Sequence, residues 1–421
     1  MKTFSVFCGT WNVNDRVLNP PADNSGLNSW LFPDIGRPPV DLYAVGFEEI
    51  IDLNARNVVL GSSESAGRAA YWQGKVKSSL DSTGQSFTII SEVHLVGMLL
   101  VIFINDSFLP HVSDIRTSVV GTGLMGVGNK GGVSTRFCIH GHSFCFVCSH
   151  LRPHEDAAAG RNADVKTIAD KIVFYPTMSE AVASSAFGDS AVDQWAFLDV
   201  PSTLHVMDHD YVFWFGDLNY GFVKPIADMQ QCLSSYFVGA FDFSSLTSFI
   251  FRIDTTYTTE AIFNMVLMGE WESLVSSDQL TIEKGKGNVF VDFHEGILAF
   301  PPTYKFTPGT DDYDQRPGHK IRAPAWCDRV LWWFRDGTPD RVRLRHCSSA
   351  ELQMSDHKPV SAAFDVDLLV PIPEKQREVY TELIDIVDKY ENSSMPRIKV
   401  SPNFVEFGCP PQEVKIRILA Y

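Results

Sequence analysis

Short apolar segments of strand length, rich in β-branched and aromatic residues, alternate with helix-like segments as far as about residue 365 of the 421-residue chain. Strands that are apolar on both faces are typical of sheets that other layers bury. The predicted strands cover residues 4–9, 41–45, 95–104, 133–139, 144–149, 211–215, 330–334, 341–346 and 360–364, and the predicted helices cover 67–80, 155–174 and 260–274. This alternation predicts a fold of the α/β class.

Polar residues follow several of these strands at the point where the strand ends. In the clearest case a buried strand ends at Gly216, and Asp217 and Asn219 come next. Such residues can simply stabilise a turn, but ligands of α/β sheets also collect at the carboxyl ends of strands. Similar positions at five other strand boundaries carry Asn12, Glu49, His150, Asp328, and Asp356 with His357. Together they predict one site, and oxygen donors without cysteine partners suit magnesium rather than zinc.

These motifs resemble those of the inositol polyphosphate 5-phosphatases, in the endonuclease/exonuclease/phosphatase superfamily that includes DNase I. The resemblance spans roughly residues 4–368 and is most specific at 300–306 (FPPTYKF) and 320–332 (KIRAPAWCDRVLW). It implies a four-layer α/β sandwich of the DNase I-like type, with the catalytic domain at residues 1–370. It also implies Mg²⁺-dependent hydrolysis of the 5-phosphate of phosphatidylinositol 4,5-bisphosphate and related inositol phosphates by direct attack of water.

The resemblance further assigns roles to individual residues. The expected metal ligands are Glu49, which is central, Asn12 and Asp356. The expected catalytic residues are Asp217 and Asn219, which orient or activate water, His357, which pairs with Asp328, and His150, which contacts the scissile phosphate. The expected substrate contacts are Tyr304, Lys305, Lys320 and Arg322, which would hold the 4-phosphate, and Asn129, Lys130, Arg161 and Asn162. Whether Asp217 or His357 handles the proton of the water stays open at this point.

The chain departs from the family pattern at several positions. Gly221 stands where the family usually has an arginine, and Gly160 replaces the first of two arginines before Asn162. Glu48 stands where glutamine is common. The glycine-rich loop at 121–132 is one residue shorter and has Val127 in place of a basic residue. Because that loop is thought to approach the lipid chains, this last departure concerns membrane engagement more than catalysis.

The distribution of charge bears on the kind of ligand. The formal net charge is −16, which argues against a surface that binds nucleic acid as a whole. Residues 301–345 nonetheless contain nine lysines and arginines against six aspartates. An anionic ligand is expected at this local basic region. The resemblance implies that this ligand is a phosphoinositide lipid on a membrane surface, bound peripherally, and the net charge argues against a nucleic acid as partner.

Features that would place the chain in or across a membrane are missing from the sequence. It has no run of about 18 apolar residues, so no membrane span is expected. Eight cysteines are scattered without a disulfide or zinc pattern, which fits a reducing cytosol. These features predict a cytoplasmic protein, and the resemblance implies that it is peripheral at endosomal or Golgi membranes or at the plasma membrane.

The residues after 370 differ in character from the rest. Pro373 is expected to open a linker helix at 371–395, with apolar residues at helical spacing along one face. Residues 396–421 resemble the start of an immunoglobulin-like β-sandwich that is truncated. This arrangement is similar to the junction after the catalytic domain in the oculocerebrorenal (Lowe) type II subfamily. Trafficking GTPase partners are expected to bind through the C-terminal region that would follow.

Two alternative functions remain open. One keeps the superfamily and changes the substrate, as in a nuclease or a sphingomyelinase-type phosphodiesterase, and the net charge argues against it. The other is a non-catalytic membrane-trafficking scaffold, against which the intact set of site residues argues. His150 and His154 could form a zinc pair, but a third ligand at fitting spacing is lacking. The sequence therefore favours the phosphatase.

Overall fold

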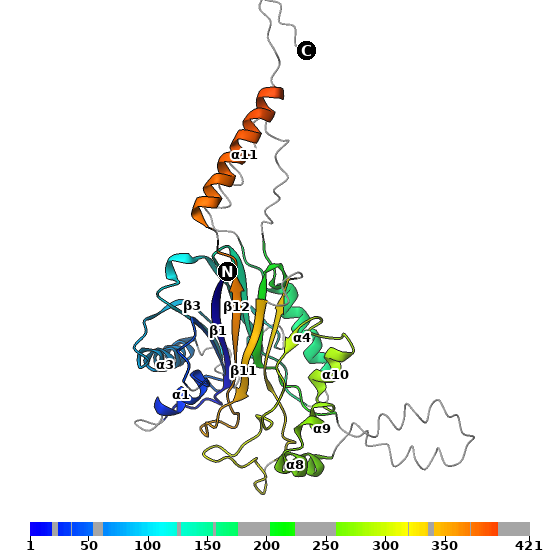
Figure 1. The fold of residues 1–421 in the computed structure, drawn as a ribbon. Coiled ribbons are helices and arrows are strands. Elements are labelled where there is room, and N and C mark those ends of the chain that lie inside the picture. The colour runs from blue at the N-terminus through cyan, green and yellow to red at the C-terminus, as the bar shows by residue number, and fades with distance from the viewer. Residues whose placement is uncertain are drawn as a thin grey trace, which may run out of the picture. The chain divides into compact units, whose positions relative to one another are not determined.

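Two six-stranded sheets pack face to face, and helices cover the outer side of each (Figure 1). The strands of the first sheet are, in order, β11 (Val342–Ser349), β12 (Val360–Leu368), β1 (Lys2–Asn12), β2 (Leu42–Glu48), β4 (Met98–Asn105) and β3 (Phe87–Leu95). Those of the second are β5 (Val112–Gly121), β6 (Gly131–Ile139), β7 (His142–His150), β8 (Tyr211–Asp217), β10 (Asp328–Phe334) and β9 (His294–Glu295).

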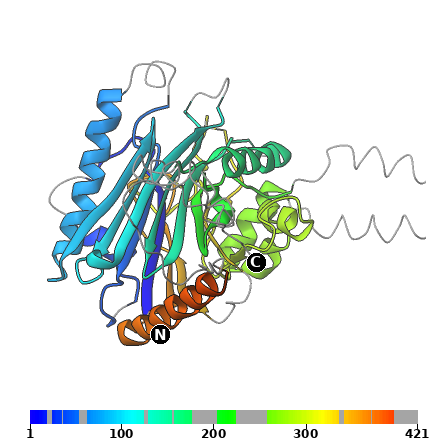
Figure 2. The ribbon, with the colours of Figure 1, turned by 90° about the horizontal axis from the view of Figure 1, so that it is seen from above.

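The helices complete a four-layer arrangement. They are α1 (Asn24–Leu31), α3 (Ser62–Asp81), α4 (Ala158–Lys171), α8 (Thr259–Met268), α9 (Trp271–Val275) and α10 (Gln279–Gly285), with 3₁₀ turns at Leu109–His111 and Val206–Asp208. A further helix, α11 (Pro373–Ser394), belongs to the separate C-terminal unit. Seen from above, α3 lies on the outer side of the first sheet, and α4 and α10 lie on that of the second (Figure 2). The expected four-layer α/β sandwich is therefore confirmed.

The computed structural model describes most of the chain, and every structural statement below concerns these residues. They are residues 1–18, 24–34, 36–53, 62–123, 128–154, 157–175, 203–223, 258–318, 320–335, 341–370 and 372–394. Residues 1–368 form one compact unit, and residues 369–421 form another.

Three apolar clusters hold the layers together. Between the sheets, aromatic side chains interlock, and the rings of Phe146 and Phe213 stack with centroids 5.2 Å apart. Under α1 and α3, Trp30 and Trp72 are fully buried. Under α4, Ile168 packs in a cluster with residues of β7 and β8. Because β2 and β8 are buried on both faces, their sequences are apolar up to the acidic residue that ends each strand, instead of alternating.

Several boundaries differ from the sequence prediction. The strand predicted at 95–104 begins later, because the chain turns at Val96 (φ 52°) and the residues before it belong to β3. The pattern does not predict β3 or β5, which are edge strands with alternating exposure. The helix predicted at 260–274 is broken at Gly269 (φ 73°), which ends α8. The β-sandwich predicted at 396–421 lies outside the described residues.

The predicted linker helix corresponds to α11. Its apolar side chains are about half exposed, with Val379 at 54% and Leu383 at 50%. Among the helices that the structure describes, none is both long enough and apolar enough to span a bilayer.

Candidate active site

Strand register places the predicted polar residues side by side. In the second sheet, Asp217 at the end of β8 lies opposite His150 of β7 and Asp328 of β10. In the first sheet, Asn12 ends β1 opposite the last residue of β2. The Asn12 amide donates from one sheet to the other, over 2.9 Å to Asp217 Oδ2. One site therefore forms at the shared end of the two sheets.

Close contact between β7 and β8 explains the glycine that precedes Asp217. Gly216 adopts φ 143°, and a Cβ there would lie 1.9 Å from the carbonyl oxygen of Ser149 on β7. Only glycine allows the two backbones to approach this closely. The approach brings Asp217 Oδ2 to 3.2 Å from His150 Nε2.

Donors from several elements hold the buried Asp217 carboxylate. Oδ2 accepts from the Asn12 amide, and Oδ1 accepts from the backbone N–H of Asn219 at 3.1 Å. Burial by itself would raise the pKa of Asp217, but the hydrogen bond from His150 and the nearby positive charges outweigh it. The pKa is held well below its ordinary value, so Asp217 is a carboxylate of fixed orientation at neutral pH.

His357 and Asp328 form a buried pair beside this carboxylate. His357 Nδ1 lies 2.9 Å from Asp328 Oδ2, which also accepts a hydrogen bond from Thr303 at 2.6 Å. His357 Nε2 lies 4.0 Å from Asp217 Oδ2. Burial alone would lower the pKa of His357, but the carboxylates of Asp328 and Asp217 raise it well above its ordinary value. The ring is therefore an imidazolium at neutral pH.

Glu49 is a carboxylate that remains open to solvent at the site. It follows β2 with φ 51°, and its side chain is 29% exposed. Its nearest nitrogen neighbours are Lys130 Nζ at 3.8 Å and His150 Nε2 at 3.6 Å, both too far for a good hydrogen bond. Lys130 also contacts the His150 ring. Burial lowers the pKa of Lys130, although the negative charge of Glu49 acts in the opposite direction. The adjacent Asn129 is partly exposed.

The donor set at this end of the sheets fits a hard divalent cation. Ligand atoms of Asp217, Asp328 and His357 come within 4.8 Å of one another. Two of these residues, Asp328 and His357, are already hydrogen-bonded to each other, whereas the carboxylate of Glu49 is more open to solvent. The negative charge of the preceding residue, Asp356, also raises the pKa of His357. Carboxylate oxygens in this arrangement suit magnesium or calcium better than zinc.

The Ser355 hydroxyl fixes the loop that carries Asp356 and His357. It donates to the carbonyl oxygen of Asn12 at 2.7 Å and accepts from the backbone N–H of His357 at 3.2 Å. The Trp11 indole donates to the His357 carbonyl oxygen at 3.0 Å. These hydrogen bonds tie the loop to the end of β1, where Asn12, another predicted metal ligand, lies.

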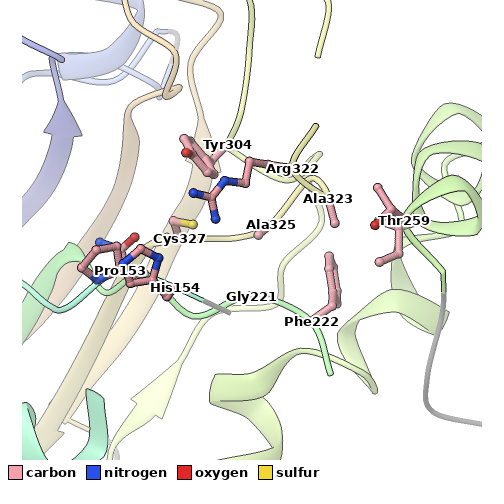
Figure 3. Close-up of a pocket in the computed structure, with 12 residues that line it drawn as sticks. Pro153, His154, Gly221, Phe222, Thr259, Tyr304, Arg322, Ala323, Ala325 and Cys327 are labelled. Atoms are coloured by element: carbon pink, nitrogen blue, oxygen red, sulfur yellow. The ribbon is translucent and has the colours of Figure 1, made fainter. Parts of the chain in front are cut away.

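A small pocket adjoins the site (Figure 3). Its volume is about 70 Å³, and its walls include Asn219, Tyr304 and Arg322. The Tyr304 ring lies against the His357 ring with centroids 4.4 Å apart. The pocket is therefore adjacent to the cluster of Asp217, Asp328 and His357, called the catalytic cluster below. Two of the four residues predicted to hold a 4-phosphate thus line one cavity.

Four of the other predicted substrate residues lie outside this pocket. Lys305 Nζ lies 3.9 Å from Asp314 Oδ2, and Lys320 is exposed; neither lines the pocket. Arg161 is fully buried on α4 and donates to Gln279. Asn162, also on α4, accepts from the Tyr220 hydroxyl at 2.6 Å and donates to Glu283 at 2.8 Å. Contact of these four residues with substrate stays a prediction.

Glu48 is a feature of the site that the sequence prediction did not include. It is fully buried, and Oε1 accepts from the Thr10 hydroxyl at 2.7 Å and the Cys148 thiol at 3.2 Å. Burial raises the pKa of Glu48 to about 8, and the hydrogen bond from Thr10 only partly offsets this. The sequence feature that could have pointed to Glu48 is that an acid stands where the family commonly has glutamine. A protonated Glu48 is, like glutamine, uncharged.

Comparison with known proteins decides the family. The chain matches the model of Endonuclease/Exonuclease/phosphatase family 2 over residues 9–363. It is 30% identical over 390 residues to type IV inositol polyphosphate 5-phosphatase 9 of Arabidopsis thaliana, with 87% of this chain and 78% of the relative covered. The chain belongs to the inositol polyphosphate 5-phosphatases. The family expected from the sequence motifs is thereby confirmed.

Further matches of this 5-phosphatase chain point to the same family. Human synaptojanin-2 is 32% identical over 404 residues, which cover 87% of this chain and 23% of the relative. The chain thus spans about a quarter of the length of the synaptojanin-2 proteins that it matches. The crystal structure of the 5-phosphatase domain of SPsynaptojanin, in complex with inositol (1,4)-bisphosphate and calcium ion, matches with a TM-score of 0.67 and 27% identity over 93% of each chain. Placement in the oculocerebrorenal subfamily stays a prediction.

Proposed function

We propose that this chain hydrolyses the 5-phosphate of phosphatidylinositol 4,5-bisphosphate and related inositol phosphates, in a magnesium-dependent reaction in which water attacks phosphorus directly. The observation that supports this most is the cluster around Asp217. There a buried carboxylate, oriented by donors from both sheets, lies beside an imidazolium and an open glutamate. The SPsynaptojanin domain binds inositol (1,4)-bisphosphate, which is what removal of a 5-phosphate from the 1,4,5-trisphosphate leaves.

Asp217 is the residue proposed to hold the attacking water. Because Asn12, His150 and the Asn219 N–H fix its orientation, it presents a charged acceptor in one direction. It accepts a hydrogen bond from the water and takes up its proton as the new oxygen–phosphorus bond forms. A carboxylate with a depressed pKa is a weak base, so orientation contributes more than basicity. The bond between phosphorus and the inositol oxygen breaks in the same displacement.

His357 and His150 are proposed to act on the phosphoryl group. His357 is charged because Asp328 pairs with Nδ1, so Nε2–H can stabilise negative charge that develops on the phosphoryl oxygens. His150 lies between Asp217 and Glu49, at 3.2 and 3.6 Å, where its Nε2 can reach the same group. These two donors are held in place before substrate binds, which limits the reorganisation that the reaction requires.

Glu49, Asn12 and Asp356 are proposed to hold the magnesium ion. The open carboxylate of Glu49 and the oxygen donors around it are the features that fit such an ion. When bound, magnesium supplies positive charge that offsets the charge on the phosphate and on the leaving oxygen. The related SPsynaptojanin domain was crystallised with calcium, another hard divalent cation.

The organisation of the rest of the chain is proposed on the same basis. Residues 1–370 would be the catalytic domain, 371–395 a linker helix, and 396–421 the first part of an immunoglobulin-like β-sandwich. The substrate would be a phosphoinositide on the surface of an endosomal, Golgi or plasma membrane, which the protein approaches from the cytoplasm. Trafficking GTPases would be further partners of the protein.

Phosphate release from a defined panel tests the proposal. The panel contains phosphatidylinositol 4,5-bisphosphate, inositol 1,4,5-trisphosphate, sphingomyelin and a DNA duplex, each with magnesium and with EDTA. We expect phosphate release from the two inositol compounds, dependent on magnesium, and no cleavage of the two diesters. Cleavage of a diester alone would favour the phosphodiesterase alternative, and inactivity on all four substrates would favour the scaffold.

A further inference from the structure

His154 follows β7 in a backbone conformation that residues with a side chain rarely adopt. Its φ is 88°. Its carbonyl oxygen accepts from the Arg161 guanidinium at 2.6 Å and from the Ala157 N–H at 3.1 Å. Arg161 is itself fully buried and lies over the Tyr220 ring, 4.9 Å from its centroid. A buried arginine thus fixes the strained conformation, and strain of this kind is concentrated at functional sites.

The same backbone conformation directs the His154 side chain to the pocket beside the catalytic cluster. His154 and Arg322 both line it, and Figure 3 shows the two side chains on either side of Cys327, with Tyr304 next to Arg322. The Arg322 and His154 side chains form no hydrogen bond or ion pair with any other residue that the structure describes. Arg152, by contrast, is paired with Asp164 at 2.6 Å. Donors from two separate loops therefore face one cavity and have no acceptor among the residues that the structure describes.

We propose that His154 is a specificity-determining residue that binds, together with Arg322, a second phosphate of the substrate next to the one that is hydrolysed. This inference rests on the proposed 5-phosphatase function and adds to it a residue that was not among the predicted substrate contacts. A phosphate that leaves water needs donors to replace its hydration. Arginine supplies two parallel donors, and the imidazole supplies one more from a different direction. The apolar wall of Phe222 and Ile262 limits the access of water to these contacts.

Two soluble lipids that differ in one phosphate test the assignment. They are the dioctanoyl forms of phosphatidylinositol 4,5-bisphosphate and phosphatidylinositol 5-phosphate, both of which carry the phosphate that is removed. We expect His154→Ala to lower kcat/KM for the bisphosphate about 10-fold, the loss typical of one charge-assisted hydrogen bond, through KM and not through kcat. The 5-phosphate substrate should be unaffected. His154→Gln, which keeps a neutral donor, should lose less.

Two additional measurements separate binding from a structural role. Calorimetry with inositol 1,4-bisphosphate should show weaker binding for His154→Ala, and the loss should shrink when Arg322 is already alanine, because both side chains hold one group. His111→Ala, at an exposed histidine near the opposite end of β6, is the control and should change nothing.

The outcomes are distinct. Equal loss on both lipids, or a lower Tm without a change in preference, overturns the inference and gives His154 a structural role. No change in either KM or calorimetric Kd overturns it as well. If the wild type hydrolyses neither lipid but binds inositol 1,4-bisphosphate in a His154-dependent way, the proposed function fails and the phosphate pocket stands.

Discussion

Replacing Glu48 by glutamine should stabilise the metal-free protein at neutral pH. Glu48 is completely buried between the two sheets, and its Oε2 has no hydrogen-bond partner among the described residues. Glutamine has almost the same shape, and its carbonyl oxygen can accept from Thr10 and Cys148 as Oε1 does. The substitution therefore removes the ionisable proton and leaves the packing unchanged.

The size of the effect follows from the pKa. Burial raises the pKa of Glu48 from 4.5 to about 8 in the folded chain. Between these values the folded chain holds a proton that the unfolded chain has released, so the free energy of unfolding falls as pH rises. Each pH unit costs about 1.4 kcal/mol, so the loss is small at pH 5 and reaches about 3 kcal/mol at pH 7. Glu48→Gln removes this loss and should gain that amount at pH 7.

Urea unfolding in EDTA between pH 5 and pH 8 measures the effect. We expect the stability of Glu48→Gln to exceed that of the wild type by an amount that grows with pH. Glu92→Gln, the same substitution at an exposed position of β3, is the control and should show no such trend. A pH-independent difference, or a less stable Glu48→Gln at pH 7, would refute the reasoning that Glu48 is buried in its neutral form.

Four other outcomes follow from the site. Asp217→Asn should lower kcat by about 100-fold or more, the range typical of losing a general base, and a change of only a few-fold would remove Asp217 from the mechanism. Asp328→Asn removes a carboxylate that raises the pKa of His357, so a pH–rate profile should show activity lost at lower pH than in the wild type. Glu49→Gln should raise the magnesium concentration needed for half-maximal rate, and an unchanged titration would exclude it as a ligand. Arg322→Ala should lower kcat/KM for 4,5-bisphosphorylated substrates ~10- to 100-fold and spare those without the 4-phosphate, and equal losses would contradict the pocket assignment.

Much of the fold could be predicted from the sequence because its central strands are buried on both faces. Segments such as 211–215 are apolar throughout, and a residue pattern of that kind is hard to mistake. Edge strands β3 and β5 could not be predicted in the same way, because their exposed side chains interrupt the apolar pattern. The break at Gly269 depends on a left-handed backbone conformation, which a helical pattern of side chains does not reveal.

The candidate site also contains residues that could be predicted from the sequence and features that could not. Asp217 and Asn219 could be identified because polar residues directly after a buried strand are conspicuous. The hydrogen bond from Asn12 to Asp217 joins residues 205 positions apart and depends on how the two sheets pack. The protonated state of Glu48 depends on burial, and the direction of the His154 side chain depends on a hydrogen bond from Arg161. None of these can be obtained from spacing along the chain.

Hydrolysis of phosphatidylinositol 4,5-bisphosphate in ¹⁸O-labelled water tests the central claim most directly. If water attacks the phosphorus of the 5-phosphate, mass spectrometry should find one ¹⁸O atom in the released inorganic phosphate and none in the lipid product, which should be phosphatidylinositol 4-phosphate. The label should appear only when magnesium is present and at a rate that Asp217→Asn reduces. Label in the inositol hydroxyl, loss of the 4-phosphate instead, or release of diacylglycerol with a soluble inositol phosphate would contradict the account.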